Sequence, residues 1–267
     1  QVTYGKNNRV GLHSSGTIAT FSAITLADIK AFYQKYFSPK HANLVIVGDI
    51  SQSEIMPKLS YLKTWQGGDY TIPEYKQFPH VTPNKIYFVD LPKSSQSVIK
   101  YSRRAMTYDA TGEYFKATLM NYPLGSAFNS RINLNLREDK GYTYGASSHF
   151  SAGKTLGRFT AGASVKKDHT FDAMLEIENE LENYQQLGLT SDEVSFMRQA
   201  ISQNEALSYE TPRQKSGFLR QLLQFDLAEN YGEQQSEIIN NISIEQLNII
   251  AKEQLSKPMQ WIVVGDG

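Results

Sequence analysis

The sequence lacks several features that would define a class of protein. It contains no cysteine, which excludes disulfide bonds, thiolate catalysis and cysteine-ligated metal sites. Its 27 Lys and Arg balance 27 Asp and Glu, and without a basic block the chain is a poor candidate for nonspecific binding to nucleic acid or a membrane surface. The longest apolar runs, residues 44–47 and 261–264, are far shorter than the ~20 residues of a membrane-spanning helix.

The composition that remains is that of an ordinary globular protein, with 40% hydrophobic and 20% charged residues. A length of 267 residues allows one large domain or two smaller ones, because domains commonly have ~100–200 residues. Gln1 is not an initiator methionine. We therefore expect a processed or excised piece of a longer product, whose first residues carry no information about targeting.

Two segments of the sequence share the same order of features. Each predicts a helix opened by a capping pair, Thr25 with Asp28 and Ser243 with Gln246. A proline, a short apolar strand and a Gly-Asp pair follow each helix, and the Gly-Asp pairs stand at residues 48–49 and 265–266. A repeat this distant does not fit a solenoid. It indicates two homologous halves, of which this chain holds the end of the first and nearly all of the second; chance recurrence of common features is the alternative.

Composition and periodicity divide the chain between these segments. Residues 67–83 are rich in Gly and Pro and predict a linker. Strand-like runs follow at 86–91 and 96–102, and alternating segments at 143–151 and 158–165 predict a hairpin. Helical spacing covers 114–122, 128–137, 171–187 and 190–209, and Thr211-Pro212 opens a further helix.

This order of elements predicts an α+β fold in which helices pack on one face of a mostly antiparallel sheet. We expect residues 1–66 to be the C-terminal end of a preceding half. Residues 67–83 would then be the linker, and residues 84–267 the second half.

The histidines form no zinc-peptidase motif. They are His13, His41, His80, His149 and His169. None stands three or four residues from another, so H-x-x-E-H and H-E-x-x-H are both absent. The G-x-S-x-G elbow and the Walker phosphate loop are absent too, and no pair of carboxylates stands out. We interpret His149 as an ordinary surface or packed histidine and expect no catalytic metal in this chain.

Residues 124–145 carry the most distinctive pattern. They predict a loop containing Gly125 and Ser126, a helix that ends at Lys140-Gly141, and then a strand. Gly141 is a natural helix C-cap, and the turn can bring Arg137 and Tyr144 to the same end of the sheet. Both side chains donate hydrogen bonds, so together they can hold peptide carbonyls or a developing oxyanion. Alternatively, Arg137 only complements the helix C-terminus and Tyr144 packs.

This stretch resembles the second-half motif of the insulinase–pitrilysin–mitochondrial processing peptidase superfamily of zinc peptidases. In that superfamily a helix ending in Leu-Arg-Glu-x-x-Gly is followed by a Tyr seven residues after the Arg. Leu136-Arg137-Glu138, Gly141 and Tyr144 match at those spacings. The similarity extends over the whole chain, through Tyr4-Gly5, residues 24–49, residues 88–92 with Gln96, and residues 189–194.

The resemblance implies two similar α+β halves that form a clamp around an enclosed chamber. The first half would carry H-x-x-E-H and a zinc ion that activates water. The second half would lack zinc and supply an Arg and a Tyr to the substrate backbone, here Arg137 and Tyr144. Gly125 is followed by Ser126-Ala127 where relatives often have a glycine pair, which disfavours a flexible substrate-guiding loop.

The implied function is that of the C-terminal portion of a zinc metalloendopeptidase that binds unfolded peptides and is inactive alone. Zinc is expected in the missing catalytic half, on the same polypeptide or a separate subunit. The alternative is a non-catalytic peptide-binding or assembly subunit that partners a separate zinc-bearing chain. A stand-alone enzyme with its own metal is a third hypothesis, which the absent motifs disfavour.

The truncated first half leads to a further expectation. Residues 25–50 would form a helix and a strand whose natural sheet partners lie in the missing half. An unpaired apolar strand promotes association, so we predict that it pairs with another chain, as in a homodimer, or packs on the second half. Bacterial relatives of this kind are often exported, which makes a periplasmic location compatible with the resemblance.

Overall fold

The computed structural model describes residues 1–71, 78, 82–207 and 209–267. Most of the expected linker at 67–83 therefore lies outside the described residues, and so does His80. The chain forms two compact units. One comprises Gln1, Gly5–Phe78 and Glu205–Ala228, and the other comprises Val2–Tyr4, Pro79–Asn204 and Glu229–Gly267.

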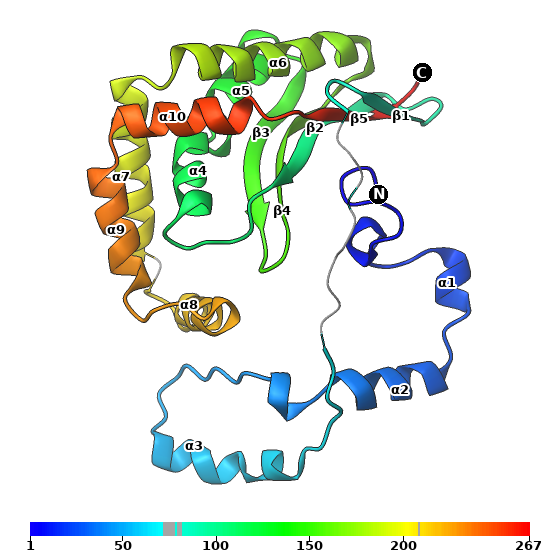
Figure 1. Cartoon of the computed structure of the whole chain (residues 1–267), viewed down its shortest axis with the longest axis vertical. Coiled ribbons are helices and arrows are strands. Elements are labelled where there is room, and N and C mark those ends of the chain that lie inside the picture. The colour runs from blue at the N-terminus through cyan, green and yellow to red at the C-terminus, as the bar shows by residue number, and fades with distance from the viewer. Residues whose placement is uncertain (72–77, 79–81, 208) are drawn as a thin grey trace. The chain divides into compact units, whose positions relative to one another are not determined.

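The second unit is built on a five-stranded sheet with the order β1-β5-β2-β4-β3 (Figure 1). The strands are β1 (Ile86–Asp90), β2 (Gln96–Ala105), β3 (Thr143–Ala152), β4 (Gly157–Lys166) and β5 (Gln260–Gly265). Every pairing is antiparallel except that of β1 with β5, which is parallel. The last strand of the chain therefore inserts between the first two, and the expected β3–β4 hairpin is confirmed.

Helices cover one face of this sheet and enclose the core. They are α4 (Glu113–Asn121), α6 (Thr170–Leu187) and α10 (Ile244–Leu255), which contact one another or the strands (Figure 1). Along β2 the buried residues Ser97, Ile99 and Tyr101 alternate with exposed ones, as a strand with one covered face requires. The core contains Ile99, Phe159 and Val165 from the strands and Leu119, Ile177 and Leu247 from the helices. The predicted α+β class, with helices on one face of a mostly antiparallel sheet, is confirmed.

Two further helices complete this layer. The predicted helix at 190–209 is α7 (Ser191–Leu207), and a capping pair forms at its start: Thr190 Oγ1 accepts from the Glu193 amide, and Glu193 accepts from the Thr190 amide. Helix α9 (Tyr231–Asn241) was not anticipated. Short 3₁₀ turns are η1 (Arg9–Gly11), η2 (Pro39–His41), η3 (Ser60–Thr64) and η6 (Lys167–His169).

The first unit contains α1 (Ile18–Ser22), α2 (Leu26–Tyr36), α3 (Gln52–Lys58) and α8 (Pro212–Phe225). The capping boxes of α2 and α10 both form, through Thr25 with Asp28 and Ser243 with Gln246. Along the apolar side of α2, Ile29, Phe32 and Tyr33 are exposed. Within the described parts of the chain, no helix is long and apolar enough to cross a membrane.

The prediction of a strand at residues 44–47 is wrong for the single chain. The segment belongs to no sheet of the described residues, and Leu44 remains 58% exposed. In the second copy of the repeat, by contrast, β5 pairs with strands on both sides, and Trp261 is only 2% exposed because it packs in the core, where its indole nitrogen donates to Glu178 of α6. The same local sequence pattern therefore has two outcomes, according to whether strands are present beside it.

Candidate functional site

Arg137 lies on an unusual helical turn. The helix expected over 128–137 is instead a short α-helical turn, α5 (Arg131–Asn133), that continues as a π-helical segment, η5 (Leu134–Asp139). The Lys140 amide closes this segment by donating to the Asn135 carbonyl at 3.0 Å, five residues back. π-Helical turns are rare and occur frequently at functional sites. The Arg137 guanidinium lies 4.5 Å from the centre of the Phe128 ring, and its Nε is 3.4 Å from Glu138 Oε1.

Gly141 ends this segment as the sequence predicts. Its φ of +66° is in the left-handed region, which glycine adopts without the steric cost of a Cβ. The next amide, that of Tyr142, donates to the Leu136 carbonyl at 2.9 Å, one residue further back than in the Schellman C-cap of an α-helix, because the segment is π-helical. The chain thereby turns directly from η5 into β3.

Tyr144 projects from a bulge at the start of β3. Thr143 pairs with Val165 and Ala146 with Ala163, so that Tyr144 and Gly145 together oppose a single residue of β4. Such bulges redirect side chains and often lie beside active sites. The Tyr144 side chain is 91% exposed, which excludes the alternative that it packs in the core.

One buried amide joins the loop of Phe128 to strand β3. Asn133 is 4% exposed, and its Nδ2 donates to the Phe128 carbonyl at 2.6 Å. Its Oδ1 accepts from the Ala146 amide at 2.9 Å. Phe128, whose ring lies beside Arg137, and the strand that carries Tyr144 are thus held by the same side chain. We refer to Arg137, Tyr144 and the Asn133 bonds between their neighbouring segments as the Arg137–Tyr144 assembly.

The loop containing Gly125 and Ser126 is fixed to the same strand. It forms a second π-helical turn, η4 (Tyr122–Ser126). A Cβ on Gly125 would lie 2.1 Å from Ser148 Oγ and 2.4 Å from the Ser148 amide nitrogen, so only glycine allows this approach to β3. Asn121 Nδ2 donates to Ser126 Oγ at 2.8 Å and to the Ser148 carbonyl at 2.7 Å. These contacts attach the loop to β3.

Ionic contacts attach the end of η5 to helix α6. Lys140 Nζ lies 2.8 Å from Glu176 Oε1, and Asn135 Nδ2 donates to both Glu176 and Glu180. The hydrogen bond from Lys140 holds the pKa of Glu176 below its ordinary value. The carboxylate therefore stays charged at neutral pH and fixes the segment that carries Arg137.

Metal-binding residues do not converge among the residues that the structure describes: no group of three His, Asp or Glu side chains could hold an ion. His149, on β3, is exposed. Its pKa is lowered by partial burial and by the positive charges of Arg158 and Lys100, which disfavour a cation there. His169 lies immediately before α6 and stacks on Tyr142 at 4.4 Å.

Sequence reasoning missed the roles of Asn133 and Phe128. A polar residue four positions before Arg137 would normally be assigned to the surface of a helix. Its anchoring role depends on contacts with β3, which no local pattern predicts.

The comparisons with known proteins agree with one another. A family model described as Peptidase M16 inactive domain matches residues 23–201. An uncharacterized zinc protease of Streptomyces coelicolor is 23% identical over 193 residues, which cover 70% of this chain and 42% of that protein. A probable inactive metalloprotease of Bacillus subtilis is 25% identical over 203 residues, covering 76% of this chain and 46% of that protein. The chain thus spans less than half the length of these relatives.

Solved structures share the fold. A peptidase M16 inactive domain from Pseudomonas fluorescens superposes with a TM-score of 0.86 at 20% identity, covering 100% of this chain and 63% of that one. A protease from Helicobacter pylori gives a TM-score of 0.82 at 16% identity, covering 94% of this chain and 61% of that one.

Proposed function

The chain belongs to the peptidase M16 inactive-domain family, and we propose that it is the C-terminal portion of a zinc metallopeptidase, in which it binds unfolded substrate peptides. In this proposal Arg137 and Tyr144 donate hydrogen bonds to backbone carbonyls of the peptide, or to the oxyanion that develops at the bond being cleaved. Cleavage itself belongs to a zinc-bearing half, on the same polypeptide or on a separate subunit.

The observation that carries the proposal is the Asn133 anchor. It holds the segment beside Arg137 and the strand of Tyr144 in one place, while leaving the tyrosine almost fully exposed. Oriented donors on a rigid support stabilise developing charge without reorganising during the reaction. An exposed phenol on a bulge has no evident structural purpose, which favours a role in binding.

The described residues do not fit a zinc site, so we assign the zinc expected for this family to the catalytic half and derive no step through it. This chain's own contribution is to bind and orient the peptide.

The test requires the chain joined to its zinc-bearing half, expressed as the complete protein or as a two-subunit complex, with a fluorogenic unfolded peptide. Arg137→Ala and Tyr144→Phe should each lower kcat/KM about 10²–10³-fold, the loss typical of one transition-state donor. Arg213→Ala and Tyr61→Phe remove the same groups from other exposed positions and should leave turnover unchanged. Unchanged turnover in both site variants would eliminate the proposed role.

A non-catalytic peptide-binding or assembly subunit is the second candidate, and the relative described as a probable inactive metalloprotease favours it. The same variants separate the two functions. If the complete wild-type protein binds the peptide without cleaving it, and both substitutions weaken that binding, the second candidate is correct.

We also propose that residues 1–66 are the C-terminal end of the catalytic half, joined through 67–83 to the second half at 84–267. The matching capping boxes of α2 and α10 support this division. So do the exposed apolar residues of α2, which require a partner surface that the catalytic half, or a second copy of the chain in a homodimer, would supply. Light scattering of the isolated chain and of the complete protein distinguishes these partners.

A further inference from the structure

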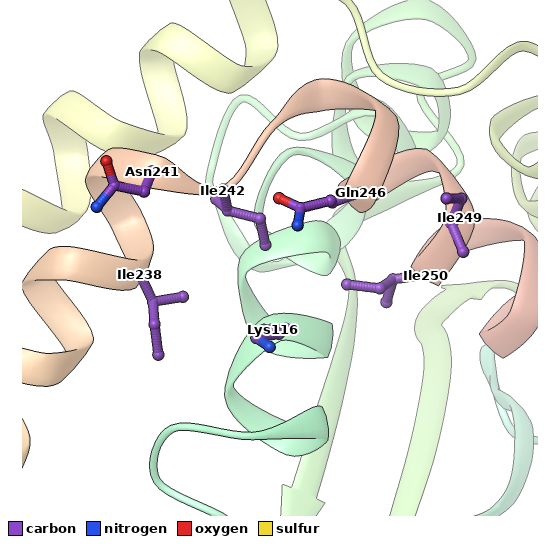
Figure 2. Close-up of a pocket in the computed structure, with 7 residues that line it drawn as sticks. All are labelled: Lys116, Ile238, Asn241, Ile242, Gln246, Ile249 and Ile250. Atoms are coloured by element: carbon purple, nitrogen blue, oxygen red, sulfur yellow. The ribbon is translucent and has the colours of Figure 1, made fainter.

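The second unit contains an apolar pocket that shares no residue with the Arg137–Tyr144 assembly. It has a volume of about 410 Å³ and lies where the end of α9 meets the start of α10, above α4 (Figure 2). The lining residues are Lys116, Ile238, Asn241, Ile242, Gln246, Ile249 and Ile250. The volume is within the range of ~300–1,000 Å³ that is usual for small-molecule sites.

Four isoleucines form the body of this pocket. Ile238 and Ile242 stand one helical turn apart at the end of α9, and Ile249 and Ile250 face them from α10 (Figure 2). Ile242 is buried, whereas Ile249 is 57% exposed. An aliphatic group placed along this wall would remove exposed hydrocarbon from water, which favours binding.

Lys116 gives the pocket one positive charge. Its side chain is half-buried on α4, and no carboxylate of the described residues lies within ion-pair distance of it. Glu113, one turn earlier, is engaged elsewhere: it accepts from Gln254 Nε2 at 2.7 Å and lies 3.9 Å from Lys257. Since this ammonium group has no counter-ion among the described residues, a ligand carboxylate can form a charge-assisted hydrogen bond with it.

A second donor lies at the mouth of the pocket. Gln246 Oε1 accepts from the Ser243 amide at 2.8 Å as part of the α10 capping box. This bond fixes the orientation of the side-chain amide. Among the described residues no acceptor is bonded to Gln246 Nε2, so this nitrogen can donate to a ligand. One ammonium and one amide donor suit the two oxygens of a single carboxylate.

We propose that this pocket binds an aliphatic carboxylate, such as a medium-chain fatty acid. The carboxylate lies between Lys116 Nζ and Gln246 Nε2, and the hydrocarbon chain follows the isoleucines. A neutral hydrocarbon would leave the lysine without a counter-ion. The C-terminus of a peptide has the same carboxylate, but it brings backbone amides that an isoleucine wall cannot pair. The proposal does not depend on the peptidase role.

The experiment titrates the whole chain with octanoate, using calorimetry and isoleucine-methyl NMR. Octanol, acetate and a leucine dipeptide with a free C-terminus are the comparison ligands. Octanoate should bind saturably and shift the methyl signals of Ile238, Ile242, Ile249 and Ile250. Octanol lacks the charge and acetate lacks the chain, so both should bind at least about tenfold more weakly.

Two variants test the assignment, and one serves as a control. Lys116→Met keeps the length of the side chain and should raise the Kd for octanoate about tenfold or more. Ile249→Gln, at an exposed position that folding tolerates, should also weaken binding. Lys154→Met removes an exposed charge from the β3–β4 turn and should leave the Kd unchanged.

Four results would overturn the proposal. They are no saturable binding of octanoate, equal affinity in the Lys116→Met variant, equal binding of octanol, and tighter binding of the dipeptide. Methyl shifts confined to isoleucines outside the pocket would have the same consequence.

Discussion

The ion pair between Arg131 and Glu193 should be a principal support of the segment that carries the candidate site. Arg131 Nε lies 2.6 Å from Glu193 Oε1, and Nη2 lies 2.6 Å from Oε2, so the pair is bidentate. Nη2 also donates to the Gly188 carbonyl at 2.9 Å, and the guanidinium lies 4.6 Å from the centre of the Tyr184 ring. Both side chains are mostly buried, at 22% and 21% exposure. The pair therefore connects the start of α5 to the start of α7 with little screening by solvent.

Replacing Arg131 with Met should lower the free energy of unfolding by about 3 kcal/mol at pH 7, because a mostly buried carboxylate loses its partner. Burial disfavours the charged form of Glu193, but the hydrogen bonds from Arg131 and Thr190 outweigh burial and lower its pKa. A carboxyl group with a lowered folded-state pKa contributes stability above its unfolded pKa of 4.5. That contribution disappears as the pH falls through the folded-state value, so the difference between wild type and variant should shrink in acid.

The two tryptophans allow the measurement to be confined to the second unit. Trp65 belongs to the first unit, whereas Trp261 is buried in the sheet of the second and stacks on Tyr101 at 4.6 Å. In a Trp65→Phe background, urea unfolding followed by fluorescence reports on Trp261 alone. A double-mutant cycle with Glu193→Gln gives the coupling energy. A coupling below about 0.5 kcal/mol, the value for exposed pairs, or a loss independent of pH, would refute the argument.

Substitutions at three positions near the candidate site separate structural from functional roles, each measured by urea unfolding. Gly125→Ala should cost about 2–3 kcal/mol, because its Cβ would overlap the side chain and the backbone nitrogen of Ser148. Gly141→Ala should cost about 1 kcal/mol through its positive φ alone, since no atom lies within 4 Å of the added Cβ, and Gly141→Asn should cost less. Tyr144→Phe should change stability by no more than about 0.5 kcal/mol, because the side chain is exposed.

Much of the fold could be predicted because its signals are local. The alternation of β2 and of the β3–β4 hairpin indicates strands whichever neighbours they have. The capping pairs of α2, α7 and α10 mark helix starts within four residues. Helix α9 also has a local start pattern, Asn230 followed three residues later by Glu233. Asn230 makes no side-chain capping bond, however, and Gly232 occupies the first turn, so a pattern of this kind indicates a helix start without fixing its contacts.

The candidate site could be predicted only in part. The Leu-Arg-Glu-x-x-Gly pattern correctly indicates a helical segment that ends at a left-handed Gly141. It does not distinguish an α-helical from a π-helical turn, because over so few residues the two differ little in apolar spacing. The β3 bulge and the two bonds of Asn133 join segments on either side of the turn. Such contacts depend on the packed sheet, so they require a structure.

Residues 44–47 do not form the predicted strand, which shows why a strand cannot be assigned from its own composition. Its counterpart β5 has a similar apolar sequence and forms hydrogen bonds with β1 on one side and β2 on the other. A strand without neighbours leaves its amide and carbonyl groups to water and gains little from its side chains. The described residues place no strand beside 44–47, so the segment remains outside any sheet although its sequence is suitable.

If the proposed catalytic half supplies the missing neighbours, hydrogen exchange at residues 44–47 should be fast in the isolated chain and slow in the complete protein. Equally fast exchange in both would show that the repeated sequence pattern does not mark a repeated structure.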